Sequence, residues 1–122
     1  MKRDLELSRE LLLAMEESPS ELSTNSLTER FEQPGEILAY HALLLEDAGL
    51  IHAAVTPKSR KVHPQAAVLL RLTHEGHEFI ESVRSDTTWN NLKQYVTKKG
   101  LEVTLDTAVK ALPGFIAAAL GG

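Results

Sequence analysis

The stretch from Gln33 to Ile51 constrains the fold more than any other part of the chain, because it predicts one helix that stops at a glycine and turns straight into a strand. Pro34 suits the first turn, where its missing N–H costs nothing, and Gly49 suits the left-handed residue after the last turn. The side chains expected on the buried face recur at helical spacing: Ile37, Leu38, His41, Leu44, Leu45 and Ala48.

The segments before this stretch predict two more helices. Asp4 can cap a first helix that carries an apolar stripe. Residues 20–25 are polar and leave room for one short strand. Ser26 and Glu29 have the spacing of a capping box, which predicts a short second helix over residues 27–32. Helix, short helix, turn and longer helix is the order that a helix-turn-helix requires.

The segments after Gly49 predict a pair of strands. Leu50–Thr56 and Ala66–Leu72 have strand-like patterns, and the loop Pro57–Pro64 between them is too long for a tight turn. Alternation in the second strand predicts that one face of the sheet receives Val68, Leu70 and Leu72. A hairpin with a long tip is typical of the wing of a winged helix-turn-helix domain.

The rest of the chain predicts three further helices. Thr73 can cap the first of them, Asp86 can cap the second, and Gly100 closes the second. A final helical stretch begins near Thr104, and Pro113 inside it is expected to kink the helix or restart it.

These elements predict a mainly α fold with a small β-hairpin, which is an α+β fold. We expect a winged helix-turn-helix domain over residues 1–85 and a C-terminal helical extension over residues 86–122. The length of 122 residues and the apolar content of 43% suffice for one hydrophobic core.

Composition excludes several classes of site. The chain has no cysteine, so disulfides, thiolate catalysis and cysteine-based zinc sites are excluded. The N-terminus lacks the apolar core of a signal peptide, and no apolar run reaches the length of a membrane span. We therefore predict a soluble cytoplasmic protein that does not bind a membrane.

Charge is unevenly distributed along the chain. Residues 1–51 hold 4 basic and 11 acidic side chains, whereas residues 65–122 hold 6 of each. Residues 52–64 hold Lys58, Arg60 and Lys61 and no acidic side chain. The concentrated positive charge therefore lies in the loop of the hairpin, where the alternatives are a solvated turn and a phosphate contact.

Two stretches resemble known families. Tyr40–Ile51 resembles the recognition-helix end of ArsR-like repressors. A broader resemblance covers nearly the whole chain and rests on five motifs: Lys2-Arg3-Asp4, Tyr40-His41, Ala48-Gly-Leu-Ile51, Arg71-Leu-Thr-His-Glu-Gly-His-Glu-Phe79 and Asp86-Thr-Thr-Trp-Asn90. With these motifs the chain resembles a bacterial and prophage family of unknown function akin to the YjcQ-like group. This resemblance implies a winged-helix-like fold and implies no activity and no catalytic or ligand residues.

The winged-helix expectation raises the hypothesis of DNA binding. Base edges would be read by the outward face of the longer helix, where we place Gly35, Glu36, Ala39, Tyr40, Ala42, Leu43, Glu46 and Asp47. That face has no Arg, Lys, Asn or Gln, so reading of bases by this helix is disfavoured. The hypothesis is weak contact with double-stranded DNA through Lys58, Arg60 and Lys61, with Tyr40 beside them, and a salt slope of about −3.

The alternative is a protein-interaction module on the same scaffold, a phage or mobile-element accessory protein. Glu46 and Asp47 are expected to be ordinary surface residues. Near the C-terminus, Phe115, Ile116 and Leu120 exceed what a terminal helix needs to cover a small core. They are candidates for a homodimer interface, and packing back on their own domain is an equal alternative.

Metal and enzyme sites have little support. His74 and His77 stand one residue closer than the His-Glu-x-x-His zinc motif requires, so no metal site is predicted. His41 lies on the buried stripe and is expected to be a hydrogen-bonded core histidine. The chain has no phosphate-binding glycine loop and no nucleophile elbow. We predict a small non-enzymatic regulatory or accessory protein with no catalytic residues and no cofactor.

Overall fold

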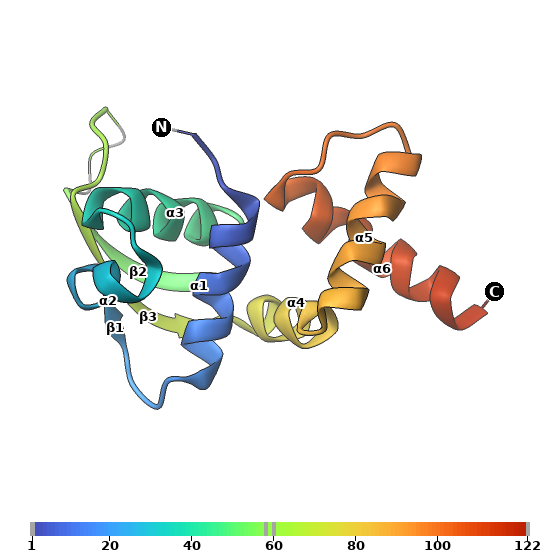
Figure 1. The fold of residues 1–122 in the computed structure, drawn as a ribbon, viewed down its shortest axis with the longest axis horizontal. Helices are drawn as coiled ribbons and strands as arrows, with labels where there is room; N and C mark the ends of the chain where they lie inside the picture. Colours follow the sequence, from blue (N-terminus) through green and yellow to red (C-terminus); the bar gives the residue numbers. More distant parts are fainter. Residues whose placement is uncertain (1, 58, 60, 122) are drawn as a thin grey trace. The chain divides into compact units, whose positions relative to one another are not determined.

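The computed structural model describes residues 2–57, 59 and 61–121, and over these residues the chain forms helices and one small sheet (Figure 1). The elements in chain order are α1 (Leu5–Glu17), β1 (Leu22–Ser23), α2 (Thr24–Phe31), α3 (Gly35–Asp47), β2 (Ile51–Thr56), β3 (Ala66–Leu72), α4 (His74–Val83), α5 (Asp86–Lys98) and α6 (Leu105–Gly121). The predicted mainly α class with a small antiparallel sheet is confirmed.

Two compact units divide the chain, Met1–His77 and Glu78–Gly122, and the division falls inside α4. The predicted domain division at residue 85 stays a prediction. In the first unit, α3 packs against α1, α2, β2 and β3. In the second, α5 packs against α6, and Phe79 of α4 meets Trp89 edge to face at 6.3 Å between ring centroids.

The sheet has three antiparallel strands in the order β1-β3-β2. The predicted hairpin is β2 and β3, and the predicted short strand is β1, whose two residues pair with Leu69 and Val68. Thr24, the first residue of α2, is buried, and its hydroxyl accepts a hydrogen bond from Ala67 N–H at 3.0 Å. This bond ties the start of α2 to β3.

A β-bulge overturns the predicted face of β3. His52 pairs with Arg71 and Ala53 pairs with Leu69, so Leu70 has no partner on β2. The extra residue shifts the alternation, and the buried residues of β3 are Ala67, Leu69 and Leu72. Leu70 is 42% exposed. Strict alternation placed Leu70 on the wrong face of the sheet, because the sequence alone does not reveal where the register of two paired strands shifts.

The start of α2 also differs from the prediction. Ser23 is its N-cap, with the side chain accepting from Ser26 N–H at 3.3 Å, so the helix begins three residues before the predicted start. Ser26 therefore lies in the first turn, and its hydroxyl donates to the Ser23 carbonyl at 2.7 Å. Ser23 and Ser26 can both cap a helix N-terminus. The pairing of β1 with β3 places Ser23 at the start of α2.

The end of α3 is the Schellman arrangement that Gly49 predicted. Gly49 has φ +78°, its N–H donates to the Glu46 carbonyl, and Leu50 N–H donates to the Leu45 carbonyl. The chain then enters β2 at once, as expected. Thr73 joins this turn to α4: its hydroxyl donates to the Gly49 carbonyl at 2.6 Å and accepts from Gly76 N–H at 3.0 Å.

Burial of α3 is wider than the predicted stripe. Ala39 and Ala42, both predicted to face outward, have no exposed surface. The reason is that α3 has helices on one side and the sheet on another, so two faces are covered rather than one. The exposed part of α3 is correspondingly narrow.

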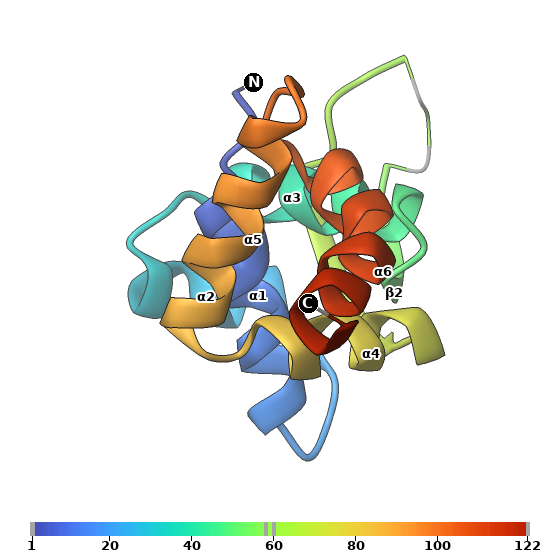
Figure 2. The same cartoon turned by 90° about the vertical axis from the view of Figure 1, so that its right-hand side faces the viewer.

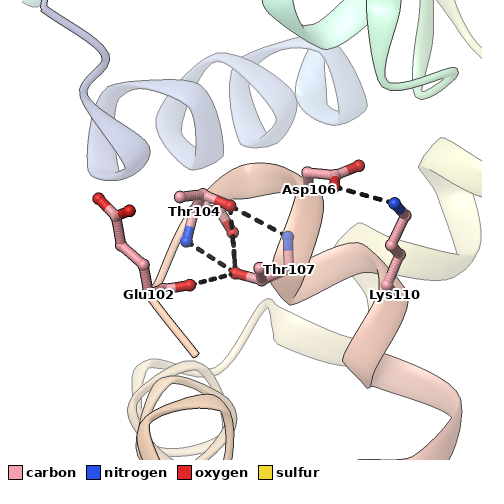
Figure 3. Close-up of polar contacts among 5 residues, drawn as sticks. All are labelled: Glu102, Thr104, Asp106, Thr107 and Lys110. Carbon is pink, nitrogen blue, oxygen red and sulfur yellow. Dashed lines mark hydrogen bonds and ion pairs between the residues drawn. The ribbon is translucent and has the colours of Figure 1, made fainter. Parts of the chain in front are cut away.

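The N-terminus of α6 is closed by a pair of threonines (Figure 3). Thr107 N–H donates to the Thr104 hydroxyl at 3.1 Å, and Thr104 N–H donates to the Thr107 hydroxyl at 2.8 Å. This is a capping box with Thr in the place of Glu. An exposed ion pair between Asp106 and Lys110, one turn apart at 3.0 Å, follows in the next turn. The helix continues through Pro113, so of the two predicted outcomes the restart is excluded and the kink stays a prediction.

Candidate functional site

The exposed stripe of α3 is the candidate site, and we call it the α3 face: Glu36, Tyr40, Leu43 and Asp47. These residues follow one another at helical spacing, with Glu36 and Asp47 exposed and the two middle residues half-buried. The α3 face is therefore acidic at both ends and apolar in the middle. None of its side chains is a bidentate hydrogen-bond donor to a base edge.

Tyr40 connects the α3 face to the loop between β2 and β3. Its ring meets His41 edge to face at 5.5 Å and His63 of the loop at 6.1 Å, centroid to centroid. His63 lies near the β3 end of this loop and is exposed. The Tyr40 ring is thus held between the helix and the base of the loop.

A cavity of about 300 Å³ opens beside the α3 face. Leu43 from α3 and Val55 from β2 supply apolar walls. The full lining is Leu43, Glu46, Ala53, Val55, Pro57, Ser59 and Pro64. The cavity lies beside the middle of the α3 face and can receive an apolar side chain of a partner.

Glu46 differs from the expectation of an ordinary surface residue. It is half-buried, and its carboxylate accepts a hydrogen bond from Ala53 N–H at 3.1 Å. Ala53 stands at the register shift of β2, where the ladder is disrupted. Glu46 therefore satisfies a backbone group of the bulge while its side chain lines the cavity. Nothing in the sequence marks this role, because Ala53 lies on another element.

The basic loop is described only in part. Lys58 and Arg60 lie outside the described residues. Lys61 is exposed, and its N–H donates to the Ser59 hydroxyl at 3.1 Å. Figures 1 and 2 show the N-terminal segment and the β2–β3 loop extending beyond α3 on the same side of the first unit. Tyr40 contacts the loop through His63, and its grouping with Lys58, Arg60 and Lys61 stays a prediction.

The three predicted interface residues lie on the second half of α6. Phe115 is half-buried, with its ring 5.7 Å from that of Tyr95. Ile116 is 36% exposed and Leu120 is 84% exposed. Packing on their own unit therefore accounts for Phe115 and leaves Leu120 uncovered. The pairing of two copies through these residues stays a prediction.

His41 is the hydrogen-bonded core histidine that its position predicted. It is 1% exposed, its Nε2 accepts from Asp4 N–H at 2.8 Å, and its Nδ1 lies 2.8 Å from the Ile37 carbonyl oxygen. Since Nε2 accepts, the proton of the neutral ring is on Nδ1, which donates to Ile37. Across residues 2–57, 59 and 61–121, no three His, Asp or Glu side chains gather as metal ligands.

Comparison with known proteins places the chain in a family. A family model described as "Hypothetical protein (DUF2513)" matches residues 2–102. The chain belongs to the DUF2513 family. The match includes the whole α3 face and ends before α6.

One relative is similar to the DUF2513 chain over most of its length. A protein of Haemophilus influenzae, named only "Uncharacterized protein", is 36% identical over 107 residues, and the match covers 87% of each chain. No solved structure matches the chain significantly. In the described part of the chain, no helix combines the length and the apolar character needed to cross a membrane.

Proposed function

We propose that this DUF2513 protein is a non-enzymatic regulatory or accessory protein with a winged-helix first unit that binds another protein through the α3 face. The observation that carries the proposal is the composition of that face, with carboxylates at both ends and Tyr40 and Leu43 between them. The partner surface that fits it has an apolar centre flanked by basic side chains.

The winged-helix assignment rests on the order of elements in the first unit. Helix, strand, helix, helix, strand and strand follow one another, and the three strands form one antiparallel sheet with β3 in the middle. In this arrangement α3 takes the place of the recognition helix, and the β2–β3 loop takes the place of the wing. The resemblance of Tyr40–Ile51 to ArsR-like repressors supports the same assignment.

Protein binding is favoured over base reading by the physics of the α3 face. A duplex repels Glu36 and Asp47, and Tyr40 and Leu43 cannot make bidentate hydrogen bonds to base edges. Burial of these two apolar side chains against a protein needs no such donors. The cavity beside Leu43 adds a pocket in which a partner can place an anchor side chain.

Capture of a partner from host lysate tests the proposal. We expect the wild-type protein to retain a protein with a basic surface, and the Tyr40→Ser/Leu43→Ser variant to lose it by about tenfold or more, since central interface residues dominate binding. The matched control is Leu70→Ser, which removes an exposed leucine from β3 in the same unit. Retention of the same proteins by all three would refute binding through the α3 face.

A second candidate function is contact with DNA phosphates through the basic loop. Lys61 is exposed, and Lys58 and Arg60 stand beside it in the sequence. A duplex mobility shift at low salt is expected for the wild-type protein, with a salt slope of about −3 if all three side chains contact phosphates. The Lys58→Ala/Arg60→Ala/Lys61→Ala variant should lose this shift. Identical shifts for both proteins would remove the loop from consideration.

A further inference from the structure

The exposed side of α5 carries the hydrogen-bonding side chains that α3 lacks. Three of the six Asn and Gln residues in the chain fall within five positions of one another on this helix. We call the exposed set the α5 face: Asn90, Asn91, Gln94 and Lys98. All four side chains are exposed, whereas Trp89, Leu92 and Val96 are buried on the opposite side of α5.

Helical geometry places the α5 face on one stripe. At 100° per residue, Asn90, Gln94 and Lys98 lie within about one quadrant of the helix, and Asn91 extends the same side. The structure has a shallow hollow of about 440 Å³ along this side, lined by Asn90, Lys93, Gln94, Thr97 and Lys98. Among the described residues, the side chains of Asn90, Asn91 and Gln94 have no hydrogen-bond partner.

After Asp86, an exposed acidic residue one turn before Asn90, the charged side chains along α5 are positive. Between Thr87 and Leu101 the chain has three lysines and no acidic residue. Two of the lysines lie over aromatic rings, Lys93 over Trp89 at 5.3 Å and Lys99 over Tyr95 at 5.2 Å. These cation–π contacts hold two ammonium groups close to the helix, and Lys98 remains exposed on the α5 face.

We infer that the α5 face binds double-stranded DNA in the major groove. An α-helix fits that groove, Asn and Gln can bond both N6 and N7 of adenine, and Lys can bond guanine or phosphate. The charge between Thr87 and Leu101 complements the phosphates on either side of the groove. The α3 face, in contrast, ends in Glu36 and Asp47 and has no basic side chain, whereas α5 carries lysines after its one acidic residue, Asp86.

Duplex DNA fits this surface better than RNA does. The major groove of duplex RNA is too deep and narrow for side chains on a helix to reach its base edges. Single strands are bound by stacking their bases on exposed aromatic rings. Trp89 is buried and the Tyr95 ring packs on Phe115, so α5 offers no such platform.

Selection from a pool of duplexes tests the inference. The full-length protein is incubated at about 50 mM salt with duplexes of randomised sequence about two helical turns long, and bound molecules are sequenced. We expect the retained duplexes to be enriched in A·T base pairs. Asn90→Ala/Gln94→Ala should weaken binding to an enriched duplex by about fivefold or more, because each bidentate contact discriminates by at least that factor. Lys98→Ala should lower the salt slope by about one.

Matched variants separate this surface from the rest of the protein. Gln65→Ala removes an exposed carboxamide and Lys110→Ala removes an exposed lysine, both outside α5, and both should bind as the wild type does. Circular dichroism verifies that every variant is folded. The inference is overturned if wild type retains no duplex, if Asn90→Ala/Gln94→Ala binds unchanged, or if duplex RNA of the same sequence binds equally. Loss of binding in the Lys58→Ala/Arg60→Ala/Lys61→Ala variant alone would assign the contact to the loop instead.

Discussion

Replacing Gly76 with alanine is expected to destabilise the first unit by about 3 kcal/mol or more. Gly76 is buried in the first turn of α4, where a Cβ atom would lie 3.0 Å from the Leu50 carbonyl carbon and closer still to its oxygen. Both neighbours are backbone, so neither can rotate away. The same oxygen accepts from Thr73 N–H at 2.9 Å, and separating the segments would break that bond as well.

The sign of this effect is diagnostic. Inside a helix, Gly→Ala ordinarily stabilises by about 0.5–1 kcal/mol, so propensity and packing predict opposite results. Urea unfolding followed by circular dichroism measures the difference. Gly121→Ala is the control, because the added Cβ would meet no atom within 4 Å. This substitution should leave the free energy of unfolding unchanged or slightly raised. Equal stability of Gly76→Ala and wild type would contradict the close approach of α4 to Leu50.

Replacing His41 with alanine is expected to cost about 3 kcal/mol of unfolding free energy. The substitution leaves a cavity in the core and removes the acceptor of the Asp4 N–H. Asp4 also caps α1, with its carboxylate accepting from Leu7 N–H at 3.1 Å, so the N-terminal end of α1 loses its attachment to α3.

The hydrogen bond and the lost volume can be separated. His41→Gln keeps an oxygen that can accept the hydrogen bond from Asp4 N–H in place of Nε2. Its loss of unfolding free energy should be about 1 kcal/mol smaller than that of His41→Ala in the same urea measurement. His52→Ala, which removes an exposed histidine from β2, should have little effect. If His41→Ala were no more costly than His52→Ala, the proposed link between α1 and α3 would be wrong.

Several local structures follow from residues close in the chain. The glycine turn at Gly49 and the cap at Thr73 form as their chemistry predicted. Each depends on a backbone conformation or a hydrogen bond within a few residues, so a short stretch of sequence contains the necessary information. The buried histidine at position 41 was likewise evident from helical spacing.

Other features needed contacts between distant segments. The burial of Ala39 and Ala42 arises because α3 is covered on two sides, and the exposure of Leu70 arises from a bulge against β2. Capping chemistry was present at both Ser23 and Ser26, and only the pairing of β1 with β3 placed the helix start at the first of them.

The α5 face likewise combines features that the sequence revealed with features that it did not. Counted over residues 65–122, the charges of the C-terminal half cancel, and this sum concealed the acid-free run from Thr87 to Leu101, which holds the part of α5 after Asp86. Helical spacing predicted that Trp89 faces inward, and the structure confirms its burial and shows Asn90 and Gln94 exposed on the opposite side of α5.

The turn at Gly49, the cap at Thr73 and the α+β class thus came from local chemistry, because hydrogen bonds and backbone preferences act over a few residues. Strand register, the buried sides of α3 and the bond from Glu46 to Ala53 came from tertiary packing. These features depend on which distant segments meet, and hydrophobic periodicity specifies that a face is buried without specifying what covers it.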